Sequence, residues 1–289
     1  MIEPEAALRF LQYGCLLPLA GILIDPVRRG RSDHGAGSGL TWLALSGLGV
    51  SIAGFGSTMQ AMTGEPLSSI DGELARFVLI ETGSGIAFLV RSTALVVTTM
   101  LLAAGRRRAA TPLAMLAVAS LAWSGHAATS DGAAGIVHRL VDVLHLAAVA
   151  GWLGAIAVLL RMNFPSASDR ASIGDRVASL RRFSATGSLL VATVVLSGAC
   201  NLVAVVGVDD MAMLPSSQYG RLLGLKLLAF LAMLIPAAVN RWRLTQMLAR
   251  DERRAAAALR LSLSMELALG MTILAVVAVL GTLDPVAPA

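Results

Sequence analysis

The sequence predicts an all-α, polytopic integral membrane protein built as a bundle of about eight transmembrane helices, and three observations support this. Of its 289 residues, 56% are hydrophobic and only 14% are charged, and the mean hydropathy is +0.75. The apolar residues form long runs, and one helical crossing of a bilayer needs about 20 of them. The basic residues gather in alternate connections between these runs.

The polar breaks divide the chain into crossings that alternate in direction. We expect these at residues 6–24, 39–59, 83–104, 110–125, 136–160, 184–207, 219–240 and 260–282. The connection after the second crossing contains GELARFVLIET (72–82), which predicts a helix lying at the membrane interface. Glycines such as Gly47, Gly49, Gly54 and Gly56 predict close helix contacts. No connection is long enough to hold another folded domain. We therefore expect residues 1–289 to form a single transmembrane helical domain.

The charges predict the orientation of the bundle. Arginines follow the first, third, fifth and seventh crossings, as in RRGR (28–31) and RRR (106–108), whereas the other connections carry acids such as Asp209 and Asp210. The positive-inside rule assigns the basic connections to the cytoplasm. We therefore expect a multi-pass protein of the bacterial inner membrane with both termini in the periplasm.

Several classes of function are excluded by the sequence. The net charge of +5 reflects topology, so we expect the lipid bilayer as a partner and no nucleic acid. No Walker or Rossmann glycine pattern, no HExxH and no nucleophile with an adjacent base occurs, so we do not expect an enzyme. Cys15 and Cys200 both fall inside predicted crossings and suggest packing rather than a disulfide framework.

Polar residues inside the predicted crossings are candidate functional groups, because an ionisable side chain in a bilayer is costly without a partner. Counted at about 1.5 Å per residue, several lie at one depth, roughly 10 Å below the outer surface. These residues are His145, Arg91, Lys226, Cys15, Cys200 and Asn201. Glu266 lies instead in the inner half, where it would pair with a basic residue such as Arg182 or Arg243 or belong to an exit path.

Histidines and an aspartate in the fifth crossing predict a metal site. His138, Asp142 and His145 are spaced i, i+4 and i+7, so they project from one helix face. His126 lies one short connection away, at the end of the fourth crossing. Imidazole suits copper and zinc, and Asp142 would be either a ligand or an acceptor that orients a histidine. The alternative is structural hydrogen bonding of helix-end histidines.

Two methionine pairs occur on the same predicted side. Met59 and Met62 form MxxM after the second crossing, and Met211 and Met213 form MxM after the sixth. Thioether sulfur favours Cu(I). With 12 methionines in the chain, chance pairs are also expected.

Further along the chain, an ordered series of motifs resembles the copper resistance protein D (CopD) family of bacterial inner-membrane proteins. The motifs are SGHAA, VDVLHLAAVAGWLGAI, RRFSATGSLLVATVVLSGACNLV, SQYGRLLGLKLLAFLAMLIPAAVNRWRL and MELALGMTILAVVAVLGTLDP, which fall within residues 120–285, with a looser match at GSGIAFLVRS. The resemblance implies an eight-helix fold, inward movement of copper, and a separate periplasmic copper-binding partner of the CopC type. By motif match it marks His126, Asp142, His145 and Lys226.

Together these observations predict binding and transport of copper, as Cu(I), Cu(II) or both. We expect the methionines to collect the ion and His126, His138 and His145 to bind it, with Asp142 as ligand or orienter. A positive charge repels a cation, so Arg91 and Lys226 would pair with acids or carbonyls or control a gate. The alternatives are a haem-binding membrane electron carrier and a copper chaperone that does not transport.

Overall fold

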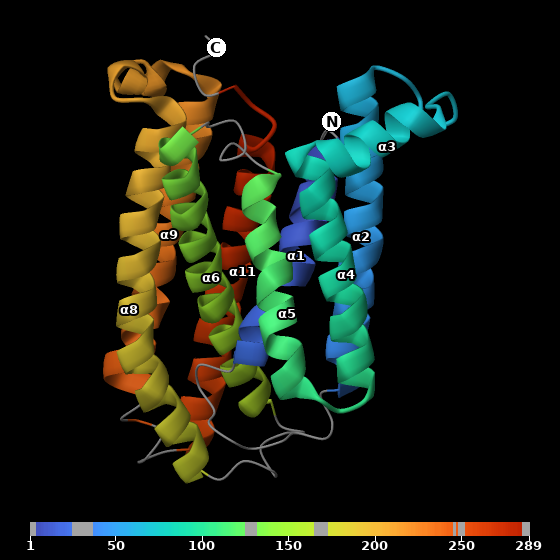
Figure 1. The fold of residues 1–289 in the computed structure, drawn as a ribbon. Helices are drawn as coiled ribbons and strands as arrows, with labels where there is room; N and C mark the ends of the chain where they lie inside the picture. The colour runs from blue at the N-terminus through green and yellow to red at the C-terminus, as the bar shows by residue number, and fades with distance from the viewer. Residues whose placement is uncertain are drawn as a thin grey trace.

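The computed structural model describes residues 4–24, 37–124, 132–164, 173–244, 247 and 252–284. These ranges are mostly helical, with short turns between the helices, and contain no strand. The long helices run up and down the molecule, as Figure 1 shows. Their bounds are α1 (Pro4–Ile24), α2 (Gly37–Thr63), α3 (Gly72–Glu81), α4 (Gly83–Ala103), α5 (Arg107–Ala119), α6 (Gly132–Met162), α8 (Ile173–Val206), α9 (Gln218–Val239) and α11 (Glu252–Leu280). Short turns are η2 (Ser120–Trp123), η4 (Asp209–Ala212), η5 (Leu214–Ser216) and the π-helical η6 (Asn240–Leu244).

The predicted polytopic all-α fold is confirmed. Seven helices in the described ranges are long and apolar enough to cross a membrane. The expected span 110–125 is different: α5 has 13 residues, Arg107–Ala119, and its helical turns then tighten into the 3-10 helix η2, which ends at Trp123. This segment still packs within the bundle against α1 and α4. In the described ranges the bundle therefore has eight helices along its long axis, of which α5 is the short one.

Both ends of the chain lie at one end of the bundle (Figure 1). We call this end, where α1 begins and α11 ends, the N/C end. The predicted helix in GELARFVLIET is α3, which lies across the N/C end. Asp71 caps it by accepting a hydrogen bond from the backbone N–H of Leu74 at 2.7 Å. Its exposed apolar side chains, including Phe77 and Ile80, suit an interfacial helix.

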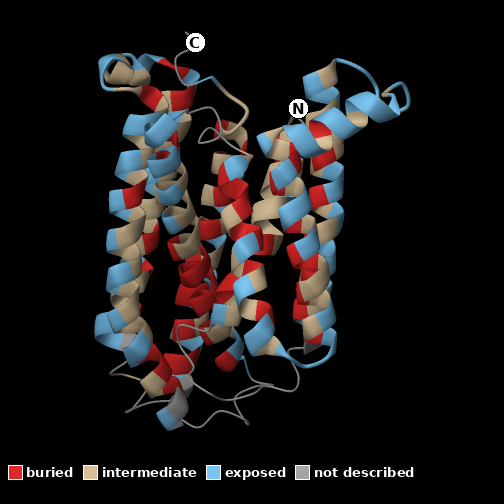
Figure 2. Ribbon diagram, in the orientation of Figure 1, coloured by how far each residue is buried: buried red, intermediate tan, exposed pale blue. Residues whose placement is uncertain are grey.

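Helices α1 and α6 form the centre of the bundle, with α2, α4 and α5 on one side and α8, α9 and α11 on the other (Figure 1). Figure 2 shows buried residues concentrated along the inward faces of these central helices and exposed ones along α8. One apolar core joins α1, α4, α5 and α6, and a second joins α6, α8, α9 and α11. Helix α6 thus belongs to both cores.

The closest helix contact is between α1 and α6. A Cβ atom added at Gly154 would lie 2.0 Å from the carbonyl carbon of Gly21, so the two backbones touch. The glycines singled out from the sequence divide into two kinds: a Cβ at Gly47 would lie 3.1 Å from Leu16 Cδ1 and one at Gly56 3.3 Å from Leu67 Cδ1, whereas a Cβ at Gly49 or Gly54 would meet nothing within 4 Å. Close packing was correctly expected at the first two, but the backbone-to-backbone contact is at Gly21 and Gly154, where only glycine allows this approach.

Candidate functional site

A cavity of about 190 Å³ opens among α1, α6, α8, α9 and α11 near the N/C end. We call it the donor cavity. Its polar lining comes from four of these helices: Arg9 and Tyr13, then His138, Asp142 and His145, then Asn201, then Tyr219 and Lys226. Metal-donor side chains therefore converge on one space from different parts of the sequence.

The predicted shared face of α6 is confirmed, because His138, Asp142 and His145 all line this cavity. Helix α6 is continuous from Gly132 to Met162, so the i, i+4, i+7 spacing stacks the three residues over successive turns. We call these three residues the donor face. His138 is buried, with 6% of its surface exposed, while Asp142 and His145 are half-buried.

Asp142 is oriented by a side chain on another helix. The Nδ2 group of Asn201 on α8 donates to Asp142 Oδ1 at 3.0 Å. The Oδ1 atom of Asn201 is itself buried and, among the described residues, has no hydrogen-bond donor. The charge of Asp142 also acts on Lys226 and Tyr13 across the cavity. Asp142 is therefore held in place while an amide oxygen beside it remains available to a cation.

The tautomer of His145 follows from its hydrogen bonds. His145 Nδ1 lies 2.9 Å from Ser197 Oγ, and that hydroxyl donates its single proton to the backbone carbonyl of Thr193. Ser197 Oγ must then accept a proton from Nδ1, which leaves Nε2 with its lone pair. This is the form in which a histidine ligates a metal. Ser197 is 4% exposed and so holds the ring from a buried position.

A second cavity of about 420 Å³ adjoins the donor cavity, because His145 and Lys226 line both. It extends between α8 and α9 to Trp152 and Met233, and most of its lining is apolar. The Trp152 ring packs edge-on against Phe183 and Phe230, with centroids 6.4 Å apart in each pair. The polar donors therefore end at the level of His145 and Lys226.

Beyond this apolar section lies Glu266, which is fully buried on α11. Asn240, the first residue of the π-helical turn η6, donates to Glu266 Oε1, whereas Glu266 Oε2 is buried with no hydrogen-bond partner among the described residues. Within the described residues, Glu266 forms no ion pair with Arg182 or Arg243, the partners suggested by the sequence. Glu266 is thus a buried carboxyl group with a neutral amide partner.

The other residues of the predicted polar layer lie outside the donor cavity, in different parts of the bundle. Arg91 lies across α1 from the donor face, in a smaller pocket described below. Cys15 packs between α1 and α2, where a Cβ at Gly47 would lie 3.5 Å from it, and Cys200 is exposed on α8. Equal depth therefore did not imply proximity, because depth leaves the direction around each helix axis undefined.

The two methionine pairs share the N/C end but lie on opposite sides of it. Met59 and Met62 are at the end of α2, and Ser84 Oγ donates to the sulfur of Met62 at 3.7 Å. Met211 and Met213 belong to the α8–α9 connection, on the other side of the bundle in Figure 1. Met213 is 62% exposed. The pairs do not form one four-sulfur site.

No three His, Cys, Asp or Glu side chains within the described ranges lie close enough to hold one metal ion together. His126 falls outside those ranges. The donor cavity also contains residues that the sequence reasoning missed, namely Arg9, Tyr13, Tyr219 and the supporting Ser197. A polar or aromatic side chain inside an apolar span was the available signal for Tyr13.

Comparison with known proteins gives matches to one family over most of the chain. The family model described as Copper resistance protein D matches residues 177–280, and the one described as Copper resistance protein D-like, N-terminal domain matches residues 1–136. The protein named Copper resistance protein D from Pseudomonas syringae pv. tomato is 32% identical over 302 residues, which cover 96% of each chain. Inner membrane protein YebZ of Escherichia coli (strain K12) is 30% identical over 166 residues, 57% of this chain and 55% of its own length. No solved structure matches. The chain belongs to the copper resistance protein D family.

Proposed function

We propose that this protein binds copper in the donor cavity, at the periplasmic side of the bacterial inner membrane, and passes it inward. The observation that carries this proposal is the donor face on α6, with His145 held as a free Nε2 donor and Asp142 held by Asn201. Family membership supplies the link to copper. The arginine-rich connections at the opposite end of the bundle support the periplasmic placement of the N/C end.

The chemistry of the donors favours this cargo. His145 and Asp142 offer the nitrogen and oxygen atoms that suit Cu(II), and the amide oxygen of Asn201 adds a third donor. Because the described residues hold no complete cluster, we propose that His126 completes the site, since it lies just before α6 in the sequence. The methionine pairs, of which Met62 and Met213 are exposed, would serve Cu(I) at the rim.

Lys226 gives the site a means of release. Its ammonium group is within electrostatic reach of Asp142, and it lies where the two cavities meet. A bound copper ion and Lys226 compete for the same carboxylate. Lys226 would therefore balance Asp142 in the empty site and weaken the hold on the ion.

A receiver that binds copper without transporting it is the second candidate, and the apolar second cavity favours it. The walls between His145 and Glu266 offer few groups that could replace the hydration of an ion. Copper uptake into proteoliposomes separates the two functions. Uptake that depends on Glu266 supports transport, whereas binding without uptake supports the receiver.

A haem-binding carrier receives no support from the described histidines. His138 and His145 lie on one face of one helix, whereas bis-histidine ligation needs donors on opposite sides of the ring. An absorption spectrum of the purified protein checks this directly, since haem gives a Soret band.

The decisive test is the copper content of purified, detergent-solubilised protein after loading with Cu(I) or Cu(II). We expect about one tightly bound copper per chain, and loss of most of it in His145→Ala. His34→Ala is the matched control, because it removes an imidazole from a connection predicted to lie on the cytoplasmic side. Equal copper in the His145→Ala and wild-type proteins would overturn the assignment.

A further inference from the structure

A second polar pocket, of about 70 Å³, lies on the other side of α1, against α2, α4 and the end of η2. We call it the arginine pocket. Its charged lining consists of Glu5, Arg9 and Arg91. Arg9 and Tyr13 line both this pocket and the donor cavity, so the two spaces flank the first turns of α1. No metal donor of the α6 face reaches the arginine pocket.

Arg91 is a buried charged residue of this pocket. It lies inside the span of α4 with only 4% of its surface exposed. Its Nη1 group donates to Ser124 Oγ at 3.3 Å, while its Nε–H is buried and has no acceptor among the described residues. A guanidinium group in such a place, with one neutral partner, is strongly unfavourable unless negative charge compensates it.

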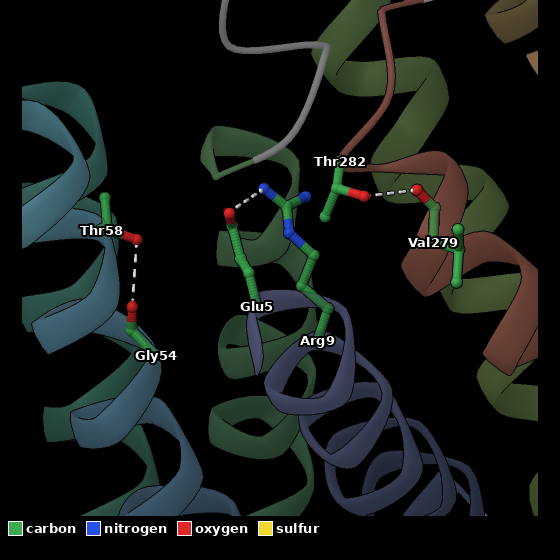
Figure 3. Close-up of polar contacts among 6 residues, drawn as sticks. All are labelled: Glu5, Arg9, Gly54, Thr58, Val279 and Thr282. Carbon is green, nitrogen blue, oxygen red and sulfur yellow. Dashed lines mark hydrogen bonds and ion pairs between the residues drawn. The ribbon is translucent and has the colours of Figure 1, made fainter. Parts of the chain in front are cut away.

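The acid in the pocket does not provide that compensation. Glu5 is engaged by Arg9, whose Nη2 lies 3.0 Å from Glu5 Oε1, as Figure 3 shows. Arg9 is fixed from the other side as well, because a Cβ at Gly281, the residue after α11, would lie 2.7 Å from its Nη1. Glu5 and Arg9 neutralise each other, so the lining retains one positive charge, that of Arg91.

Neutral donors surround this charge. Ser124 Oγ accepts from Arg91 and so keeps its own proton for another acceptor. Ser57, half-buried on α2, lines the pocket and makes no hydrogen bond through its hydroxyl within the described structure. Thr58 differs, because it donates to the Gly54 carbonyl at 3.0 Å (Figure 3). The amide of Gln12, which also lines the pocket, donates to Ser51 Oγ at 3.2 Å. The groups beside the Arg91 charge that lack an acceptor in the described structure are thus its Nε–H and the hydroxyls of Ser57 and Ser124.

We propose that the arginine pocket binds a small monovalent anion of the halide class, held by Arg91 with Ser124 and Ser57. One such ion neutralises the remaining charge and accepts from the unused Nε–H and hydroxyl groups. The pocket volume of about 70 Å³ is sufficient for a monatomic ion. Because the pocket shares Arg9 and Tyr13 with the donor cavity, the anion also reduces the positive potential beside the copper donors.

The test uses the full chain in detergent without copper, since chloride itself complexes copper. The unfolding temperature is measured while sodium chloride replaces sodium gluconate at constant ionic strength, and binding of radiolabelled chloride is measured in parallel. We expect saturable stabilisation by chloride and bromide and little by gluconate. Arg91→Gln should lose both the stabilisation and the binding. Arg161→Gln, which removes an exposed arginine on α6, should keep both.

A second variant keeps the proposal testable if Arg91→Gln does not fold. Ser124→Ala retains the positive charge but removes a donor, so its half-saturating chloride concentration should rise several-fold. No saturable chloride effect in the wild-type protein, or an equal effect in Ser124→Ala and the wild-type protein, would overturn the proposal. Either result would leave the copper assignment intact, because that assignment depends on different residues.

Discussion

The two polar spaces at the N/C end lie on either side of α1 and share Arg9 and Tyr13, yet their chemistry differs. The donor cavity adds two imidazoles, a carboxylate and an amide beside Lys226, whereas the arginine pocket adds the Arg91 guanidinium group and hydroxyls beside a carboxylate, Glu5, that is already paired with Arg9. The difference arises because α6 supplies His138, Asp142 and His145 to one side, and α4 supplies Arg91 to the other. The proposed copper site therefore lies in the half of the bundle that contains α6, α8, α9 and α11.

The largest expected effect comes from separating α1 from α6, on which both spaces depend. Gly154→Val places side-chain atoms where the Gly21 backbone already lies, so the two helices cannot keep their contact. We expect loss of folded, monodisperse protein, since overpacking costs about 1–3 kcal/mol or more even where only side chains must move. Size-exclusion chromatography and thermal unfolding in detergent measure this.

Gly49→Ala is the control for that variant, because a Cβ at this α2 position meets nothing within 4 Å. It should fold normally. A Gly154→Val protein that unfolds at the wild-type temperature would show that the α1–α6 contact is not the one described.

An intermediate effect is expected from Ser197→Ala, which acts on the donor cavity alone. The variant keeps every proposed metal donor but removes the hydroxyl group that holds Nδ1 of His145 in the wild-type protein, so the imidazole ring is free to rotate. Loss of such supporting hydrogen bonds typically weakens metal binding by about 10–100-fold. Copper titration against a competing chelator measures the change.

Ser264→Ala, at an exposed position of α11, should leave the copper affinity unchanged. Unchanged affinity in Ser197→Ala itself would mean that His145 is not a ligand or does not need this orientation. The chloride response of the arginine pocket should persist in both serine variants.

The smallest effect is expected from Lys226→Met, and this variant should hold copper more tightly, whereas Ser197→Ala should hold it more weakly. Without the ammonium group, the copper ion no longer competes with Lys226 for the Asp142 carboxylate. Copper should therefore dissociate several-fold more slowly. Stopped-flow transfer to a chelator measures the rate. Arg221→Gln, at an exposed position of the same helix, should not alter it. Faster release from Lys226→Met would show that Lys226 supports the site instead of competing with the ion.

The sequence was sufficient to predict the elements and one face of the site. Apolar runs predicted the spans, and the i, i+4, i+7 spacing placed His138, Asp142 and His145 together, because both properties are local to a helix. The sequence placed Asn201 at the depth of His145, but the contacts of Asn201 with Asp142 and of Ser197 with His145 were not predictable, since both residues come from another helix whose rotation depends on packing. The same limit explains why Arg91 and Lys226, equal in depth, lie in different spaces.

The contact that sets this packing also escaped the sequence reasoning. Gly154 lies in the same helix as the donor face, yet nothing in a single sequence distinguishes it from Gly49 or Gly54, which approach no neighbour. Only the tertiary structure shows that Gly21 lies opposite it. The short α5 segment was expected to be a full span for a similar reason, since its helical end is set by local turns rather than by composition.

The most direct test of the central claim is to locate the metal. We would determine the structure of the copper-loaded protein and calculate an anomalous difference map at the copper absorption edge. The account predicts one main peak in the donor cavity, within coordination distance of His145 Nε2 and the Asp142 carboxylate. A main peak at either methionine pair with none beside His145 would contradict it, as would a copper-loaded protein whose donor cavity holds no peak.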